Sequence, residues 1–318
     1  MKASILFTSA GRRVGLINCF RVAARELGVE LRILAADLVP QHSAACQVAD
    51  ASFKVPRVTD PNYTAVLKNI ALNEGVSLIV PTIDTELSAL ARVRAEFEQR
   101  GVRIQISSEQ FVEMCRDKLD TARYLFGLGL EVPKTWVFSE VQPDDLPYPV
   151  IAKPRSGSSS IGIEIVRDMK ALMELGDRPN YILQEFLNGP EFTINTFYDV
   201  QGVFRAAIPH RRLETRGGEM SKGITIADHR FTDMARLVGS GPAAARGVFC
   251  FQAIMTDSGP KIFEVNARFG GGYPLADRAG GHFARWLMEE VLDLPSTAND
   301  QWQAGLTCLR YDSEVFLG

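Results

Sequence analysis

The sequence has little that would mark a nucleic-acid-binding or membrane protein. Its 35 Lys and Arg residues are balanced by 38 Asp and Glu residues, which gives a net charge of −3 and a pI near 5.9. This balance provides no general attraction for a phosphate backbone or an anionic membrane. The longest stretch without a charged residue, Leu38 to Ala49, is shorter than the about 20 apolar residues of a spanning helix. We therefore expect neither nucleic acid nor a membrane as a partner.

Several local signatures are also missing. The five cysteines are scattered and form no C-x-x-C pair, which argues against a disulfide framework or a zinc site, so we expect reduced thiols in the core. The N-terminal apolar stretch turns polar at Thr8, too early for a secretory leader. No Gly-Lys dipeptide occurs, so a Walker A phosphate loop is excluded. Together these absences favour a cytoplasmic protein.

The first third of the chain alternates short apolar strands with amphipathic helices. Strands are expected at 4–8, 31–35, 77–80 and 102–106. Between them apolar residues recur at helical spacing. The alternation predicts a parallel sheet with helices on both faces, a Rossmann-like domain over residues 1–107. Ser107 with Gln110 fits a capping box that opens a helix through Met114, which we interpret as the domain boundary.

The rest of the chain predicts two α+β domains. A small lid over 108–186 is expected to have strands at 135–138, 149–153, 163–166 and 181–186, with one helix at 169–175. From Glu191 onward long alternating runs predict antiparallel hairpins in a third domain, 187–318, with a last helix at 283–292. The predicted fold class is thus α/β followed by α+β.

Polar residues at the ends of the first predicted strands mark a crevice. Ser9 to Arg13, Asp37 and Asp84 follow strands of a parallel sheet, which is where such sheets bind ligands. The alternative, that Gly11 only turns the chain and the arginines are solvated, stays open. The segment is not G-x-G-x-x-G, so it gives weak support for dinucleotide binding.

Three oxygen-bearing side chains indicate a metal site on a hairpin. Gln252 and Glu264 are equally distant from Ser258 in a turn-like segment, so they would face each other, with Asn266 on the same face. The other face carries Phe249, Phe251, Phe263 and Val265, which we expect to pack inward. Hard oxygen ligands favour Mg²⁺. An exposed polar face is the alternative.

Two further segments could hold a nucleotide. Lys153 ends an apolar strand and is followed by small hydroxyl and glycine residues whose N–H and O–H groups could hold anionic oxygens; a flexible Ser-rich linker is the alternative. A strand ending at Gln184 to Leu187 precedes a Gly-Pro break, and Glu191 follows it. Free backbone groups there could pair with an adenine edge, and Glu191 with ribose hydroxyls.

Taken in this order, the motifs resemble the ATP-grasp superfamily, most of all the branch related to the large subunit of carbamoyl phosphate synthase. The resemblance covers nearly the whole chain. It implies a Rossmann-like domain, a small lid and a larger C-terminal domain, with ATP held between the last two. Many members have an acid at the position of Gln252, so the number of bound Mg²⁺ ions stays open.

The resemblance also implies roles for individual residues. Arg268 and Lys153 would be catalytic, with Arg268 near an acyl phosphate. ATP would be bound by Lys118, Lys153, Ser156, Gly157, Ser158, Ser159, Ser160, Gly162, Gln184, Glu185, Phe186, Leu187 and Glu191. Mg²⁺, or Mn²⁺ in its place, would be held by Gln252, Glu264 and Asn266. Substrate contacts would come from Arg12, Asp84, Arg211, Arg216, Glu219 and Lys222.

The implied activity is that of a Mg·ATP-dependent carboxylate–amine ligase that forms an acyl phosphate on a small, amino-acid-like substrate. Small-molecule carboxylate and amine substrates, and a homodimer, are the expected partners. The alternatives are a carbamoyl-phosphate-synthase-like kinase of bicarbonate or carbamate, although the chain holds one ATP-grasp unit rather than two, and a non-catalytic ATP-binding sensor. A Rossmann dehydrogenase has little support, because the Gly239–Ala244 segment follows a helix-like run. We interpret His210 and His229 as structural or exposed.

Overall fold

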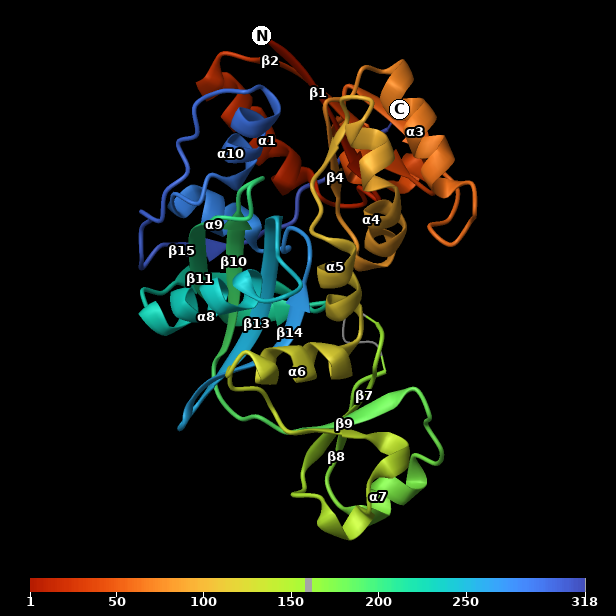
Figure 1. Cartoon of the computed structure of the whole chain (residues 1–318), viewed down its shortest axis with the longest axis vertical. Helices are drawn as coiled ribbons and strands as arrows, with labels where there is room; N and C mark the ends of the chain where they lie inside the picture. The colour runs from red at the N-terminus through yellow and green to blue at the C-terminus, as the bar shows by residue number, and fades with distance from the viewer. Residues whose placement is uncertain (158–161, 318) are drawn as a thin grey trace.

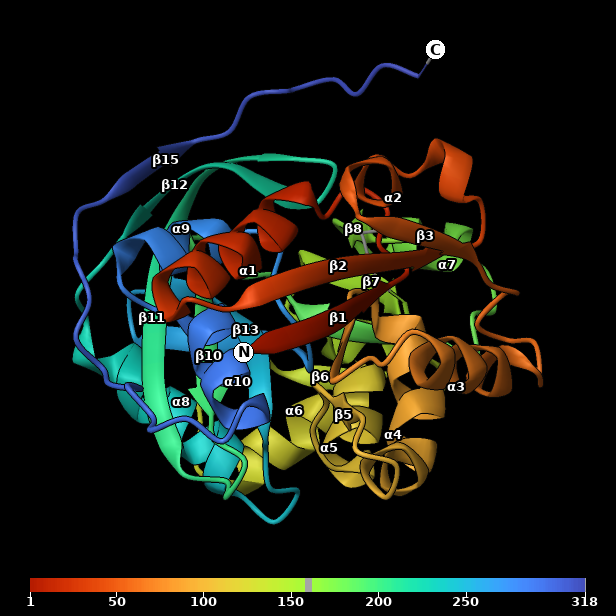
Figure 2. The same cartoon turned by 90° about the horizontal axis from the view of Figure 1, so that it is seen from above.

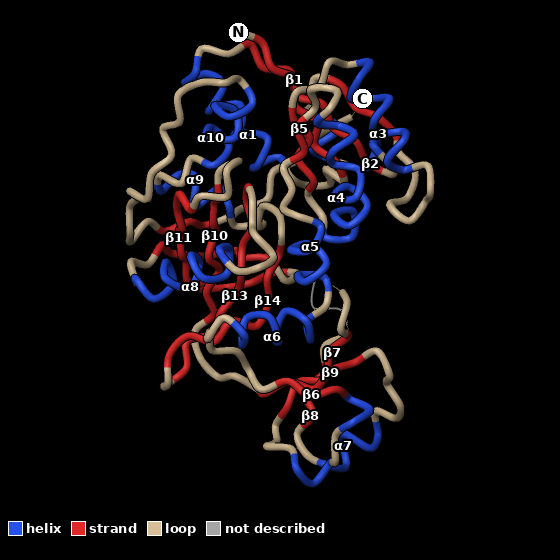
Figure 3. The backbone as a smooth tube through the Cα atoms, viewed as in Figure 1, coloured by secondary structure: helices blue, strands red, loops and turns tan. Residues whose placement is uncertain are grey.

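The computed structural model describes residues 1–157 and 162–317, and its strands form three sheets. Figure 1 shows the first sheet and its helices at the top, the largest sheet at the centre and a small separate lid at the bottom. The strands of each sheet stand out in red in Figure 3. The sheets contain strands from residues 2–104, 135–185 and 191–309 respectively.

The first sheet is parallel and has helices on both faces, as predicted. Its strand order is β3-β2-β1-β4-β5. The strands are β1 (Lys2–Thr8), β2 (Glu30–Asp37), β3 (Ala51–Lys54), β4 (Leu78–Pro81) and β5 (Arg103–Ile104). The helices are α1 (Val14–Leu27), η1 (Pro40–His42), α2 (Ala44–Val48), α3 (Tyr63–Asn73) and α4 (Asp84–Glu98). The sequence did not indicate β3 or α2, and β5 is shorter than expected.

Alternation along β1 explains why both faces are covered. Ile5 and Phe7 pack with Phe20 of α1, whereas Leu6 packs in the cluster that contains Leu67 of α3. Successive side chains of a strand point to opposite faces, so an apolar run requires helices on both sides. Figure 2 shows α1 on one side of β1 and β2, and α3 and α4 on the other.

The predicted capping box of Ser107 and Gln110 is wrong, because the helix begins one residue later with a simple N-cap. Helix α5 (Glu109–Arg116) is capped by Ser108, whose Oγ accepts from Phe111 N at 3.1 Å. Ser107 instead bonds to the backbone of Arg246, donating to its O at 2.8 Å and accepting from its N at 2.9 Å. A further helix that was not predicted, α6 (Lys118–Gly127), follows at once.

The lid is a four-stranded antiparallel sheet with its own small core. The order is β6-β9-β7-β8, with β6 (Thr135–Val137), β7 (Val150–Pro154), β8 (Glu164–Val166) and β9 (Tyr181–Glu185). The helical segments are η2 (Phe138–Glu140), η3 (Pro143–Asp145) and α7 (Met169–Glu174). Its core, built on Val150, Ala152, Val166, Leu172 and Leu183, is separate from those of the two larger sheets.

The third sheet is antiparallel, as the alternating runs predicted. Its order is β14-β13-β10-β11-β12-β15. The strands are β10 (Glu191–Tyr198), β11 (Phe204–Arg216), β12 (Glu219–Thr225), β13 (Gly247–Thr256), β14 (Gly259–Asn266) and β15 (Thr307–Leu309). The helices are α8 (His229–Ser240), α9 (Tyr273–Ala279) and α10 (Phe283–Val291).

The β13–β14 hairpin confirms the predicted pairing and corrects one face. Gln252 lies directly opposite Glu264, and Cys250 opposite Asn266. The register shifts between Gln252 and Ala253, so β14 carries one extra residue there, as in a β-bulge. As a result Ile262 packs inward, whereas the prediction that Phe263 packs there is wrong, because Phe263 lines a cavity.

The first and third sheets are joined by side-chain-to-backbone hydrogen bonds. The Gln105 amide donates to Val248 O at 2.9 Å and accepts from Val248 N at 3.1 Å. A Cβ on Gly247 would lie 1.9 Å from Gln105 Oε1, so only glycine allows this approach. One apolar core contains residues of both sheets, including Ile79 and Phe251, so these sheets form one packed unit.

The prediction that the cysteines are core thiols is confirmed for three of the five. Cys19, Cys46 and Cys250 are buried, whereas Cys115 and Cys308 are only partly so, and all five are free thiols. Among the described residues, no helix combines the length and apolarity needed to cross a bilayer.

Candidate active site

One cavity of about 360 Å³ lies where the three sheets meet. Predicted site residues from distant parts of the chain line it together: Arg12, Asp84, Lys118, Lys153, Gly157, Glu191, Glu219, Gln252, Glu264, Asn266 and Arg268. The cavity therefore has one end with the two predicted lysines and another, crevice end with residues that follow β1 and β4.

Lys118 is positioned by the first turn of α6. Asp117 caps this helix by accepting from Leu119 N at 2.9 Å and Asp120 N at 3.2 Å. The same carboxylate pairs with Arg155 at 2.7 Å, which ties the helix to the end of β7. Lys118 Nζ donates to Gly157 O at 2.9 Å. Burial lowers the pKa of Lys118, although nearby Glu264 opposes this.

Lys153 is buried on β7 and faces the same cavity. Its side chain lies over the Phe263 ring, with Nζ 5.8 Å from the ring centre. Burial lowers its pKa to about 8, nearby Glu264 opposes this shift, and Lys118 adds to it. The bulge in β14 thus places an aromatic face beside the lysine.

The Gln252 amide connects Glu264 to Arg212. In the orientation that satisfies both neighbours, its nitrogen donates to Glu264 Oε2 at 2.8 Å and its oxygen accepts from Arg212 Nη1 at 2.7 Å. Burial raises the pKa of Glu264, which Lys118 and Lys153 oppose. Glu264 is thus a desolvated carboxylate in cationic surroundings.

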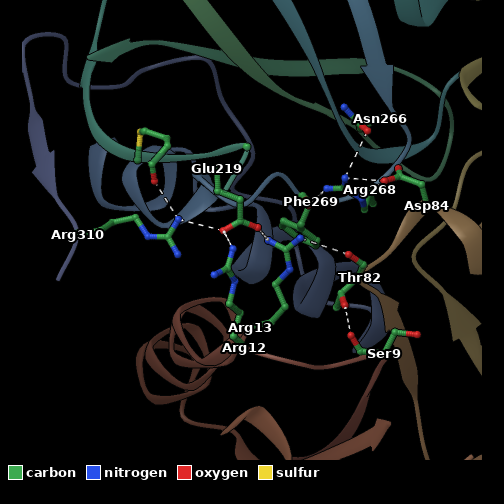
Figure 4. Close-up of polar contacts among 12 residues, drawn as sticks. Ser9, Arg12, Arg13, Thr82, Asp84, Glu219, Asn266, Arg268, Phe269 and Arg310 are labelled. Atoms are coloured by element: carbon green, nitrogen blue, oxygen red, sulfur yellow. Dashed lines mark hydrogen bonds and ion pairs between the residues drawn. The ribbon is translucent and has the colours of Figure 1, made fainter. Parts of the chain in front are cut away.

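Arg268 is fixed between Asn266 and Asp84. It donates to Asp84 Oδ2 from Nη2 at 2.6 Å and from Nε at 2.9 Å, and to Asn266 Oδ1 at 3.3 Å. Asp84 is the first residue of α4, so this pair joins the crevice of the first sheet to the hairpin of the third. Figure 4 shows the pair beside Asn266.

At the crevice end, Arg12 and Arg13 point from the turn before α1 toward Glu219 (Figure 4). Each guanidinium lies 3.3 Å from the Glu219 carboxylate. Arg13 also donates to Thr82 O at 3.4 Å. The turn after β1, which forms part of the crevice, is stabilised by the fully buried Glu86. Its carboxylate accepts hydrogen bonds from Tyr63 Oη at 2.5 Å and from Ser9 Oγ at 3.0 Å.

Some predicted residues lie elsewhere. Arg211 is exposed, Arg216 pairs with Asp312 at 2.6 Å, and Lys222 pairs with Glu214 at 2.7 Å, so none of these three lines the cavity. Ser156 is exposed, and Gly162 and the hinge residues Gln184, Glu185, Phe186 and Leu187 are not part of the cavity wall either. Ser158, Ser159 and Ser160 lie outside the described residues.

The hinge side chains have structural partners. Gln184 donates to Thr135 Oγ1 at 2.9 Å, and Glu185 pairs with Lys261 at 2.9 Å. The latter pair connects the lid to β14.

Several residues of the cavity wall were not predicted as site residues, among them three with basic side chains. Arg212, not its neighbour Arg211, faces the cavity, where it contacts Glu191 and donates to Gly218 O at 2.7 Å. Arg13 was part of the predicted crevice but not chosen as a site residue. His210 lines the cavity, is fully buried and lies 3.3 Å from Asn195 Nδ2; burial lowers its pKa to about 3. His229 is exposed, as expected.

A parallel first domain, an antiparallel lid and a larger antiparallel sheet around one cation-lined cavity define the ATP-grasp class of proteins. A family model described as an ATP-grasp domain matches residues 115–272, and one described as "PylC-like, N-terminal domain" matches residues 5–105. The chain therefore belongs to the ATP-grasp superfamily, as the sequence motifs predicted. The N-terminal match specifies a PylC-like first domain.

Curated relatives are distant and match only part of this chain. The chain is 24% identical over 211 residues to the 3-methyl-D-ornithine–L-lysine ligase of Methanosarcina mazei, which covers 66% of this chain and 53% of the relative. It is 27% identical over 217 residues to a D-alanine–D-alanine ligase of Thermotoga maritima, covering 60% of this chain and 71% of the relative. The chain thus spans about half the length of the first relative.

Solved structures show the same fold. An ADP complex of N5-carboxyaminoimidazole ribonucleotide synthetase matches with a TM-score of 0.73 at 16% identity, over 94% of this chain and 79% of that one. The biotin carboxylase domain of Hydrogenobacter thermophilus 2-oxoglutarate carboxylase, a dimer complexed with MgADP, ADP and bicarbonate, matches with a TM-score of 0.72 at 15% identity, over 93% and 71%.

Proposed function

We propose that the protein is a Mg·ATP-dependent carboxylate–amine ligase that acts on a small, amino-acid-like carboxylate. A carboxylate oxygen attacks the γ-phosphorus and ADP leaves; an amine nitrogen then attacks the acyl carbon, phosphate leaves and the nitrogen loses a proton. The cavity that gathers Lys118, Lys153, Glu264, Asn266 and Arg268 carries the proposal. The relatives named as amino-acid ligases support the substrate class.

The cavity's cations match the needs of phosphoryl transfer. This reaction depends mostly on positioning and on neutralising charge at the phosphate oxygens. Lys118 and Lys153 would contact the nucleotide phosphates from opposite sides, since one comes from α6 and the other from the lid. Arg268, held rigidly by Asp84, would orient the substrate carboxylate and stabilise the acyl phosphate.

The oxygen donors beside the lysines fit Mg²⁺. Glu264 is a partly buried carboxylate and Asn266 offers a buried amide oxygen, which are hard ligands of the kind this ion prefers. Gln252 would be a third ligand only after its amide turns over, because its oxygen faces Arg212. When bound, the ion would neutralise phosphate charge. We propose ATP with Mg²⁺, or Mn²⁺ in its place, as cofactors.

An ADP-release assay over pooled carboxylates and amines, with product masses recorded, tests the proposal. We expect ADP formation that requires both pools and an amide product. Arg268→Gln should lower kcat by about 10²–10³-fold, as loss of one preorganised donor does elsewhere. Arg230→Gln, an exposed arginine of α8 paired with Asp228, is the matched control.

Two results would contradict the ligase. ATP hydrolysis stimulated by bicarbonate alone, without an acylated amine, would favour a bicarbonate or carbamate kinase. Nucleotide binding without turnover in any pool would favour a sensor. A homodimer is the further proposal for its assembly, and light scattering of the purified chain measures it.

A further inference from the structure

Three guanidinium groups surround the carboxylate of Glu219. Arg12 Nη2 and Arg13 Nη1 each lie 3.3 Å from it, and Arg310 Nη1 donates to its Oε2 at 3.2 Å. The arginines come from the turn before α1 and from the segment after β15, so distant parts of the chain meet at one carboxylate (Figure 4). Arg310 lies outside both regions that match family models.

The cluster has more positive than negative charge. The Glu219 carboxylate contacts three guanidiniums, whereas Arg268 with Asp84 and Arg216 with Asp312, which also lies near Arg12 and Arg310, form one-to-one pairs. Only 18% of the Arg13 side chain and 23% of the Glu219 side chain are exposed. Burial would raise the pKa of Glu219, but Arg13, Arg12 and Arg310 together lower it, so it is ionised at neutral pH. The Arg12 and Arg310 side chains are 66% and 39% exposed, so Arg13 is the partly desolvated cation and the other two complete an excess of positive charge open to a further anion.

Glu219 fits this position loosely. Charge-assisted hydrogen bonds between nitrogen and carboxylate oxygen are usually about 2.7–2.9 Å long, and all three contacts here are longer. The residue follows Gly217 and Gly218, whose φ values of 57° and 75° form the tight turn of the β11–β12 hairpin. A Cβ on Gly271 would lie 2.7 Å from the Glu219 carboxyl carbon, so glycine there leaves it room.

We propose that the Glu219 carboxylate occupies the position of a substrate carboxylate, and that the substrate is a dicarboxylate. One carboxylate would be phosphorylated beside Arg268, and the second would displace Glu219 and bind Arg12, Arg13 and Arg310. This inference rests on the proposed ligase function, and it specifies an acidic substrate. The hairpin that carries Glu219 would move with the exchange.

Calorimetric titration with glutarate, in the presence of saturating MgADP, tests the exchange. In Glu219→Gln the competing carboxylate is gone, so glutarate should bind about tenfold more tightly than to the wild type. Butyrate, with one carboxylate, should show no such gain. Arg13→Gln should weaken glutarate binding at least about tenfold while MgADP binding is retained. Glu214→Gln, which removes the same charge from an exposed pair on this hairpin, should change nothing.

Opposite outcomes overturn the inference. Weaker glutarate binding to Glu219→Gln would show that Glu219 holds a substrate cation, and an unchanged affinity would show no competition. Glu219→Asp, which keeps the charge but shortens the side chain, should give a smaller gain than Gln and serves as the second variant. If the wild type fails to bind MgADP, the proposed ligase fails; the same comparison without nucleotide still decides the inference.

Discussion

A single buried lysine links the electrostatics of the site to pH. Lys153 has a pKa of about 8 because burial disfavours its charged form, while Glu264 only partly compensates. In the proposed reaction this side chain has to be charged to bind phosphate oxygens. Its folded-state pKa is depressed, so the charge is present below pH 8 and lost above it.

We expect kcat/KM for MgATP to be nearly constant below pH 7 and to fall about tenfold per pH unit well above pH 8, because this parameter reports the free enzyme. Lys153→Arg keeps its charge in this range and should remove the falling limb, although its overall rate should be lower because the geometry differs. Initial rates between pH 6 and 10 measure both. A limb near pH 8 that persists in Lys153→Arg would assign it to another group.

At the same scale, the sequence indicated the type of site but not the orientation of every side chain. The spacing of Gln252 and Glu264 about Ser258 predicted their pairing, but the hairpin reaches it in another way. Thr256 pairs with Gly259, so the turn is centred between Asp257 and Ser258, and the extra residue in β14 then brings Glu264 opposite Gln252. Arg211 and Arg212 are neighbours, and which of them faces the cavity depends on the register of β11 with β12. The register is regular through both residues and shifts only after Arg212, so Arg212 shares the face of His210 by simple alternation, and the sequence did not show which face of β11 the cavity lies on.

Among elements, long periodic segments were predictable and short ones were not. The strands around β1, β4, β10 and β13 have strong alternation or apolar runs, so the fold class followed from them. The bulge at Phe263 was missed because the turn was placed at Ser258, whereas Thr256 pairs with Gly259 and the pairing up to Ile262 is one residue out of step with that at Glu264. Helix α6 was missed because its capping residue Asp117 directly follows α5 in the chain.

The α6 cap is expected to serve both stability and the site. Asp117→Ala should lower the free energy of unfolding by about 1–2 kcal/mol, as loss of an N-cap does, and should lower kcat/KM for ATP because Lys118 is the next residue. Asp168→Ala, the cap of α7, is the control. It should lower stability without affecting kcat/KM. Urea denaturation and initial rates measure the two effects; equal losses of kcat/KM would contradict the role of α6.

At the scale of the whole molecule, the contact between the first and third sheets fixes the position of the crevice relative to the β13–β14 hairpin. The Gln105 side-chain amide forms hydrogen bonds with the backbone N–H and C=O of Val248. This close approach requires Gly247, whose φ is 71°. Asp84 of the first sheet and Arg268 of the third can then pair.

Gly247→Ala should destabilise the protein, because both the positive φ and the contact with Gln105 are affected. Gly202→Ala is the matched control: its φ is 76°, but the nearest atom to an added Cβ, Ala245 O, lies 3.9 Å away. Strain at positive φ, about 1–2 kcal/mol, is common to both. We expect Gly247→Ala to lose at least about 1 kcal/mol more, from the Gln105 hydrogen bonds. Equal losses in urea denaturation would show that the joint contributes nothing.

Because the lid has its own apolar core, it can open locally while the two larger sheets stay folded. Lys118 belongs to a helix packed on the shared core, whereas Lys153 belongs to a strand whose apolar residues pack in the lid core, and polar contacts such as Asp117 with Arg155 join the two. A nucleotide that touches both lysines therefore couples two units that could otherwise open independently. Amide hydrogen exchange should be faster in β7 and β9 than in β1 and β13, and MgATP should slow it most in the lid.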